Sequence, residues 1–250
     1  MLLLNQLHRR SCGDTGRALG ARLGGPRLDI SIDITDGLAR IAWDDGKMNA
    51  MNLVALAELA EAMDEAEAKA EALLLVGRPG AFCAGFDMAD MLGGDPDIAI
   101  KLGLGGGTLA RRIFGFAGPT VAICTGHAFT VGLLWLLASD TRVGEAGRFK
   151  LSMTEVKLGV PLEGWPLPLL AARVSPTALQ AVAIQSKVYA PDEEAIRAGF
   201  LDEVVEAGQG EKRALEHLEG LRALPVESYG RTKLALRKEA LAAMDAGLRR

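Results

Sequence analysis

Aromatic residues are scarce in this 250-residue chain, at 5% of the sequence, and basic side chains are outnumbered by acidic ones. The formal net charge is −4 at neutral pH. A nucleic-acid surface usually needs a basic face, and binding of single strands also needs aromatic platforms on which bases stack. We therefore expect no nucleic-acid partner.

Cysteine and histidine are also rare, with three of each in the chain. Cys12, Cys83 and Cys124 form no Cys-x-x-Cys pair, and the histidines are far apart in the sequence. An odd number of cysteines without such spacing fits a reducing compartment and gives no metal-binding pattern. We expect a cytoplasmic protein without a metal site.

Long apolar runs are missing as well, because none reaches the roughly 18 residues that a membrane helix needs. We expect no membrane partner. Residues 1–27 carry five arginines against one acid, Asp14. An Arg-rich, acid-poor start is typical of a transit peptide, which would place the protein in mitochondria. The interpretation we favour is a disordered or non-native extension, because periodic structure begins near Leu28.

The rest of the chain is rich in apolar residues, which make up 49% of the whole sequence and allow a sizeable core. Residues 28–35 alternate apolar and polar, and Asp36-Gly37 is a hairpin turn into a second strand. Asn52 is placed to cap a helix that ends near Lys69, before a buried strand at 72–76. This alternation predicts an α/β fold. Further helices are expected at 97–116, 131–138, 166–173, 175–185, 191–198, 211–223 and 228–248.

Glycines weaken one of these helices, the one at 97–116, which contains Gly103 and a run at 105–107. Two explanations are open at this point. The glycines make a mobile lid over a ligand, or they reflect simple looseness of the segment.

Two segments share a strand–turn–helix pattern. The first runs from the strand at 72–76 through a glycine-bearing turn to Asp87, which is placed to cap a helix. The turn residues Gly77 and Gly80 predict that regular structure stops there. The second runs from 119 through Gly126 into an apolar helix. If the two strands are adjacent, their turns aim two backbone N–H groups at one oxygen, which is what an oxyanion hole requires.

Five sequence motifs together resemble the crotonase superfamily, also called the enoyl-CoA hydratase/isomerase family. They occur in family order and near-family spacing, within a resemblance that covers residues 28–246. The motifs are Gly-Lys-Met-Asn-Ala-Met at 46–51, Gly-Ala-Phe-Cys-Ala-Gly-Phe-Asp at 80–87, Thr-Gly-His-Ala at 125–128, Ala-Ser-Asp at 138–140 and Glu-Val-Lys-Leu-Gly at 155–159. Five ordered motifs are a specific pattern, whereas one alone is weak.

The resemblance implies an architecture that periodicity does not predict. It implies a crotonase-like spiral of ββα units with C-terminal helices. Residues 28–190 would form the spiral core and residues 191–250 the C-terminal helical region. Relatives usually assemble as homotrimers or dimers of trimers, so we expect the same here.

The resemblance also implies a chemistry, in which an acyl-CoA thioester is converted to an enolate. Two N–H groups hold the thioester oxygen, and by motif match they belong to Phe86 and Val131. Many relatives have three glycines where this chain has Thr130-Val131-Gly132, so the bulk of Val131 is a departure from the pattern. CoA belongs to the substrate, and no further cofactor is implied.

The acid–base residue distinguishes the possible reactions within the family. Hydratases use two glutamates, and the first would fall at Leu134, which cannot activate water. The second is Glu155, the one that Δ3,Δ2-enoyl-CoA isomerases keep as a proton shuttle. We therefore expect double-bond isomerisation in fatty-acid or related acyl-CoA metabolism. An enoyl-CoA hydratase and a non-catalytic relative that binds acyl-CoA or a protein remain alternatives, and Glu163 is the alternative carboxylate.

The resemblance also assigns residues to CoA. Other polar residues of the motifs are expected to be structural, namely His127, Cys83 and Asp140, the last as the anchor of a neighbouring loop. The candidate CoA contacts are Lys47, Met48 and Ala50, the backbone of Phe82 and Ala84, and Lys233 near the 3′-phosphate.

Overall fold

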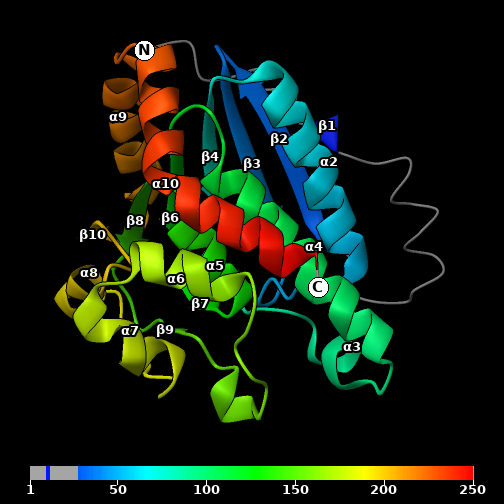
Figure 1. Ribbon diagram of the computed structural model, residues 1–250. Coiled ribbons are helices and arrows are strands. Elements are labelled where there is room, and N and C mark those ends of the chain that lie inside the picture. The colour runs from blue at the N-terminus through cyan, green and yellow to red at the C-terminus, as the bar shows by residue number, and fades with distance from the viewer. Residues whose placement is uncertain (1–9, 12–27, 250) are drawn as a thin grey trace.

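The computed structural model describes residues 10–11 and 28–249 (Figure 1). Within the expected N-terminal extension it describes only strand β1 (Arg10–Ser11), which pairs antiparallel with strand β2. The remainder of that expectation lies outside the described residues.

A seven-stranded sheet has the order β1-β2-β3-β4-β6-β8-β10. Strands β2 (Asp29–Thr35) and β3 (Leu38–Asp44) form the predicted antiparallel hairpin. Asp36 and Gly37, with φ of 50° and 74°, make its two-residue turn. Positive φ at both positions fits the right-handed twist of the flanking strands, so this prediction is confirmed.

The other half of this sheet is parallel. Strands β4 (Ala72–Val76), β6 (Thr120–Cys124), β8 (Thr141–Glu145) and β10 (Glu203–Val205) follow β3 in that order. Each neighbouring pair from β3 to β10 runs parallel, and helices connect the strands. The α/β class predicted from the sequence is confirmed.

Strand β4 is buried on both faces and divides two hydrophobic layers. Leu73 and Leu75 face the main core, to which helix α2 (Leu53–Lys69) contributes. Leu74 faces the other way, into a smaller cluster with residues of helix α9 (Gly210–Arg222). Helices α2 and α9 accordingly lie on opposite sides of the sheet (Figure 1).

A second, three-stranded sheet corrects the expectation that regular structure stops after Gly77. Strands β5 (Gly80–Cys83), β7 (Gly126–Phe129) and β9 (Leu151–Ser152) pair in parallel in that order. Gly80 turns the chain with a φ of +87°. The chain then extends as β5 because β7, far away in sequence, satisfies its backbone groups. The glycines at 77 and 80 indicate a local turn, but they carry no information about a pairing strand that is distant in the sequence.

The expected helices are present: those at 131–138 and 166–173 have the expected ends, and the other predicted ranges differ by at most two residues at either end. The N-caps at Asn52 and Asp87 are confirmed, since the Asn52 side chain accepts from the N–H of Ala55 and Asp87 accepts from Ala89. The remaining helices are α3 (Met88–Leu92), α4 (Pro96–Phe114), α5 (Val131–Ala138), η1 (Val156–Leu158), α6 (Pro166–Arg173), α7 (Pro176–Ala183), α8 (Glu193–Ala198) and α10 (Val226–Leu248).

The glycine run at 105–107 of α4 allows close packing, which was neither of the two explanations left open, whereas a Cβ at Gly103 would meet nothing within 4 Å. A Cβ at Gly107 would lie 2.6 Å from Cε2 of Trp165, and one at Gly105 would lie 3.1 Å from Cδ1 of Leu56. The 2.6 Å contact leaves no room for a side chain at Gly107, whereas a Cβ at Gly105 would require Leu56 to shift by a few tenths of an ångström. These glycines therefore allow neighbouring elements to approach α4 closely.

The C-terminal helices share the main core with the rest of the chain. Helix α10 crosses α4 and α6 (Figure 1), and its residues Leu241 and Met244 are buried there. Phe200, which follows α8, also belongs to this core. The predicted boundary between 190 and 191 therefore does not separate two cores.

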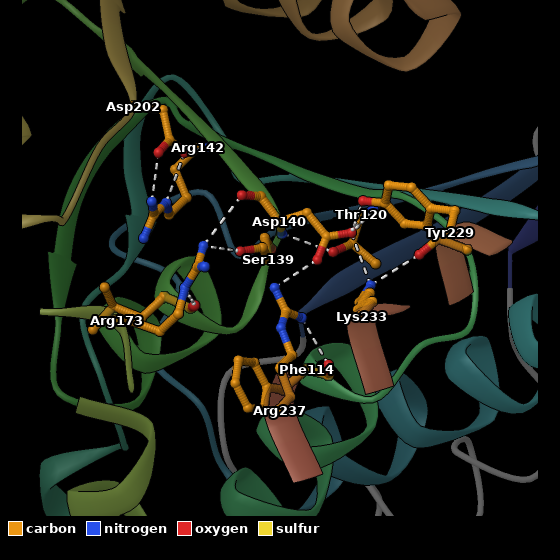
Figure 2. A network of polar contacts seen from close by, with 12 residues as sticks. Phe114, Thr120, Ser139, Asp140, Arg142, Arg173, Asp202, Tyr229, Lys233 and Arg237 are labelled. Carbon is orange, nitrogen blue, oxygen red and sulfur yellow. Dashed lines mark hydrogen bonds and ion pairs between the residues drawn. The ribbon is translucent and has the colours of Figure 1, made fainter. Parts of the chain in front are cut away.

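A buried carboxylate, that of Asp140, joins α10 to the large sheet (Figure 2). Its Oδ2 accepts from Thr120 N–H at 2.9 Å, Tyr229 hydroxyl at 2.7 Å and Lys233 Nζ at 2.8 Å. Its Oδ1 pairs with Arg237 at 2.7 Å. Burial alone would raise the Asp140 pKa, but the two cations and these hydrogen bonds outweigh it and hold the pKa below its usual value. Asp140 is thus an anchor, but it holds helix α10 and the start of β6 and not the neighbouring loop that we expected.

Arg173 extends this network to the end of α5 (Figure 2). It donates from Nε to the Leu137 carbonyl at 2.8 Å and from Nη2 to the Ser139 carbonyl at 2.7 Å. A cation at the carbonyl end of a helix is favourable. Burial and the nearby Arg142 and Arg237 lower the Arg173 pKa to about 9.

We predict that Asp140→Asn destabilises the protein by roughly 3–5 kcal/mol, because it leaves Lys233 and Arg237 buried without a counter-ion. Urea unfolding measures the loss. The control is Glu227→Gln, which breaks the exposed pair between Glu227 and Arg231 and should cost under about 0.5 kcal/mol. Equal losses for the two variants would contradict a central role for Asp140.

Candidate active site

The first turn leaves the N–H group of Phe86 unpaired. Met51 bonds to the residues on either side, donating its N–H to the Gly85 carbonyl at 2.9 Å and accepting the Asp87 N–H at 2.9 Å. In extended backbone, successive N–H groups point to opposite edges. The Phe86 N–H therefore points away from Met51, and it meets no acceptor within the described part of the chain.

The second turn ends where α5 begins. Val131 is the first residue of that helix, and the N–H groups of a first helical turn have no intrahelical acceptor. Among the residues that the structure describes, none accepts from the Val131 N–H. The group also lies at the positive end of the helix dipole.

Pairing of β5 with β7 brings the two turns into contact. A Cβ at Gly85 would lie 2.2 Å from Oγ1 of Thr130, so the turns touch at these two residues. Gly85 has a φ of +98° and immediately precedes Phe86, while Thr130 immediately precedes Val131. The structure therefore brings together the backbones of Phe86 and Val131, the two positions predicted from the sequence.

Thr130 is a residue of this site that the sequence reasoning missed. It adopts φ 49° and ψ −118°, a conformation that favours glycine and is strained for a β-branched side chain. Its Oγ1 is buried and has no hydrogen-bond partner among residues 28–249. The signal was present in the sequence, because Thr130 occupies the first position of a run that is glycine in many relatives.

Glu155 lies shortly after β9, the strand that pairs with β7 and contacts the second turn. The Thr130 N–H donates to the carbonyl of Ser152 at 3.1 Å, and Glu155 follows three residues later. Its Oε2 is buried and lacks a partner in the described chain. Burial raises the Glu155 pKa, an effect that the backbone N–H groups of Glu155 and Thr154 partly offset. A carboxyl group with a raised pKa and a free oxygen can accept and return a proton.

Leu134 projects from α5, a helix whose eight residues are all buried. The Leu134 side chain is only 2% exposed. An aliphatic side chain cannot orient water by hydrogen bonding. Hydratases carry glutamate at two sequence positions. In this chain only one of them, Glu155, has a carboxylate.

The segment predicted to bind CoA folds against β5. The Ala84 N–H donates to the Met48 carbonyl at 2.9 Å, so two of the predicted contacts lie together. Lys47 is exposed, and Nη1 of Arg78 donates to its carbonyl at 2.7 Å. Arg78 is a second cation here that the sequence reasoning did not assign to CoA, and paired cations suit phosphate groups.

Asn49 holds this segment in place and was also missed. It has a φ of 55° and is fully buried. Its Nδ2 donates to the carbonyls of Ala81 at 3.0 Å and Phe82 at 3.2 Å. Trp43 Nε1 also donates to the Phe82 carbonyl, at 2.7 Å. The Phe82 carbonyl thus already accepts two hydrogen bonds and is a poor candidate for the backbone contact to CoA predicted at Phe82. Ala50, which follows Asn49, is half-buried.

Lys233 lies elsewhere. Its Nζ binds the Gly118 carbonyl at 2.9 Å and Asp140, just before β6 begins, whereas the 47–50 segment follows the end of β3. Since β3, β4 and β6 are parallel, Lys233 and the 47–50 segment lie at opposite ends of the strands. They are separated by a strand length of about 17 Å. We correct the prediction accordingly and remove Lys233 from this chain's candidate CoA site.

His127 and Cys83 have structural surroundings. Nδ1 of His127 accepts the Lys150 N–H at 3.1 Å, and its ring stacks on Phe129 with centroids 5.8 Å apart. Burial and the charge of Lys150 lower the His127 pKa. Cys83 is completely buried, which raises its thiol pKa to about 12, so it is a poor nucleophile.

Comparison with known proteins identifies the family. The family model for enoyl-CoA hydratase/isomerase matches residues 33–248. The chain belongs to the enoyl-CoA hydratase/isomerase family. Its fold is accordingly the crotonase fold, and the family's substrates are CoA thioesters.

Individual relatives of this enoyl-CoA hydratase/isomerase family member carry different activity names. Human mitochondrial enoyl-CoA delta isomerase 1 is 26% identical over 90% of this chain and 78% of its own length. A probable enoyl-CoA hydratase from Rhodobacter capsulatus is 31% identical over 70% of this chain and 68% of its own length.

Two solved structures of a single Mycobacterium tuberculosis protein are described with different activity names. One Mycobacterium tuberculosis structure is described as a probable enoyl-CoA hydratase, with a TM-score of 0.84, 31% identity and coverage of 90% of this chain and 94% of that chain. Another is described as an enoyl-CoA isomerase, with a TM-score of 0.83, 31% identity and coverage of 91% and 97%. Similarity therefore fixes the family and the fold, and leaves the choice of reaction to the site.

The described residues contain neither a cluster of metal-ligand side chains nor a membrane-spanning helix. These residues contain no group of three or more His, Cys, Asp or Glu side chains that could hold a metal ion. Within the same ranges, no helix has the length and apolar character needed to cross a bilayer.

We predict that Thr130→Gly stabilises the protein by about 1 kcal/mol. Relief of a strained φ and loss of an unpartnered hydroxyl each favour the variant by about 1–3 kcal/mol, against the entropy cost of glycine and the lost packing. The same change at Thr108, inside α4, should instead cost about 0.3–0.5 kcal/mol. The free energy of unfolding in urea is measured for both variants. A lower value for Thr130→Gly than for the parent protein would contradict strain at that residue.

Proposed function

We propose that this protein is an acyl-CoA enzyme that shifts a carbon–carbon double bond through a thioester enolate, as Δ3,Δ2-enoyl-CoA isomerases do. The observation that carries the proposal is the combination of two unpaired N–H groups, at Phe86 and Val131, with one buried carboxyl group at Glu155 that has an unpartnered oxygen. The family assignment supplies the thioester substrate.

The proposed reaction needs one base and one oxyanion hole. Glu155 removes a proton from the α-carbon of a β,γ-unsaturated thioester. The C–H electron pair forms a double bond between the α-carbon and the carbonyl carbon, and the carbonyl π electrons move onto the thioester oxygen. The Phe86 and Val131 N–H groups donate to that oxygen; each such donor lowers a barrier by about 2.7–4 kcal/mol. The Glu155 carboxyl then returns its proton to the γ-carbon, which leaves the double bond between the α- and β-carbons.

Two alternatives remain distinguishable from this reaction. Hydration of an α,β-unsaturated thioester requires a held water molecule, and the side chain of Leu134 cannot hold one. A non-catalytic acyl-CoA binder would make use of the same turns without needing a proton shuttle. The raised pKa of Glu155 supports catalysis over binding alone, because burial of an ionisable group near a ligand site is typical of acid–base residues.

A panel of enoyl-CoA esters of different chain length tests the proposal. Double-bond shift and water addition are measured separately for each ester. We expect isomerisation at least 100-fold faster than hydration, by analogy with the effect of about 10²–10⁴ that a positioned acid or base contributes. Brisk hydration would overturn the assignment, and the absence of both reactions with CoA binding retained would favour the non-catalytic alternative.

Glu155→Gln should lower kcat for isomerisation by about 10²–10⁴-fold while KM changes little, because the amide keeps the shape but cannot exchange a proton. Glu163→Gln is the matched control at the alternative carboxylate and should retain activity. If Glu163→Gln loses activity and Glu155→Gln retains it, Glu163 is the base.

The pH profile gives an independent check on Glu155. The base must be ionised, so kcat/KM should rise with pH through the Glu155 pKa and level off above it. Because burial raises that pKa, the midpoint should lie above the usual glutamate value of about 4.3. A profile flat down to pH 4.5 would contradict a buried carboxylate as the base.

CoA binding should require no metal. The cations Lys47 and Arg78, together with the backbone segments at Met48 and Ala84, which are linked by a hydrogen bond, would supply the contacts. Calorimetry with acetyl-CoA in the presence of EDTA measures this, and loss of binding on adding EDTA would contradict it.

We also propose assembly as a homotrimer or a dimer of trimers. Exposed apolar side chains support a buried subunit contact, among them Leu158 at 53%, Ile184 at 61% and Leu236 at 84% exposure. Light scattering should give three or six times the chain mass of 26.4 kDa. A monomeric mass would count against the proposal.

A further inference from the structure

One glycine of α4, Gly106, faces both residues whose N–H groups form the proposed oxyanion hole. A Cβ at this position would lie 2.7 Å from Cζ of Phe86 and 2.8 Å from Cγ2 of Val131. The side chains of Phe86 and Val131, which come from the two turns, therefore meet on the same spot of α4. They occupy the space that any other residue at 106 would need.

The two contacts differ in how easily they can give way. The Phe86 atom is at the tip of a ring, which can tilt about its side-chain torsions. Cγ2 of Val131 is bonded directly to Cβ, and a β-branched side chain in a helix has one strongly preferred rotamer. Pressure on that methyl group is therefore passed to the Val131 backbone, and with it to the N–H that the reaction uses.

Helix α4 cannot simply retreat from α5. Nε1 of Trp135, on α5, donates to the carbonyl of Gly106 at 3.0 Å. Trp135 is 1% exposed and packs edge-on against Trp43 with centroids 6.1 Å apart. The same residue of α4 is thus tied to α5 through its carbonyl and pressed by Phe86 and Val131 at its α-carbon.

We propose that Gly106 is a positioning residue that sets the spacing between the Phe86 and Val131 N–H groups. Both side chains rest against the helix surface at Gly106. The hydrogen bond from Trp135 to the Gly106 carbonyl fixes the distance between that surface and α5. This inference rests on the proposed function, since it assumes that the two N–H groups hold a thioester oxygen.

Gly106→Ala tests the inference against Gly103→Ala, a matched control on the same helix. A Cβ at Gly103 meets nothing within 4 Å, so both variants gain the same methyl group and the same helix propensity. We expect Gly106→Ala to lower kcat for isomerisation by about 10- to 100-fold, because a displacement below 1 Å already misaligns an oxyanion donor. KM and acetyl-CoA binding should change less than about threefold, since the donors act mainly in the transition state.

A double-mutant cycle with Val131→Ala separates positioning from general loss of structure. Val131→Ala removes the methyl group that Gly106→Ala would strike and keeps the backbone N–H. The kcat ratio between alanine and glycine at position 106 should therefore shrink to under about threefold in the Val131→Ala background. Phe86→Leu, which removes the ring tip, should relieve the effect only in part.

The outcomes distinguish this inference from the proposed function. If the parent protein lacks isomerase activity, the proposed function fails and this inference fails with it. If the parent is active and Gly106→Ala behaves like Gly103→Ala, only the positioning role is overturned. That role is also overturned if Val131→Ala leaves the Gly106→Ala effect undiminished, because the loss then does not pass through the Val131 side chain.

Discussion

The parallel pairing of β5 with β7 is the constraint on which the site depends. Backbone groups of a buried turn must find partners or cost free energy. Here Met51 satisfies the backbone around Phe86, and Ser152 satisfies Thr130. At these two turns the N–H groups of Phe86 and Val131 find no acceptor among the described residues, so a ligand oxygen could accept from both. The strained φ of Thr130 belongs to the same arrangement, because strain persists only where surrounding structure fixes the chain.

Two buried carboxylates show how the same chain treats charge in opposite ways. Asp140 is surrounded by Lys233, Arg237 and hydrogen-bond donors, which lower its pKa and make it a fixed anion that holds α10 to the sheet. Glu155 has no cation partner among the described residues, and burial raises its pKa. A fully paired carboxylate suits structure, whereas one with a free oxygen and a pKa moved toward neutrality suits proton transfer. The difference comes from neighbours that are distant in sequence.

Helix α4 connects these features to the packing of the molecule. Its glycines first indicated a weak or mobile helix, since glycine lowers helix propensity. In the structure they admit Leu56, Trp165 and the two oxyanion-turn residues to within van der Waals distance of the helix backbone. Helix stability here depends on tertiary contacts more than on propensity, and the glycines at 105–107 mark positions where neighbouring side chains approach the helix.

The sequence by itself determined the features that depend on neighbours along the chain. Alternation at 28–35, the Asp36-Gly37 turn and the caps at Asn52 and Asp87 are set by side chains within a few residues, so local periodicity and turn chemistry predicted them. Motif order likewise identified the family. Only the tertiary structure decided that β5 pairs with β7, that Lys233 serves Asp140 and that Gly106 meets Phe86 and Val131. Each of these contacts joins residues 20 or more positions apart, and such contacts depend on how whole elements pack, which no local pattern encodes.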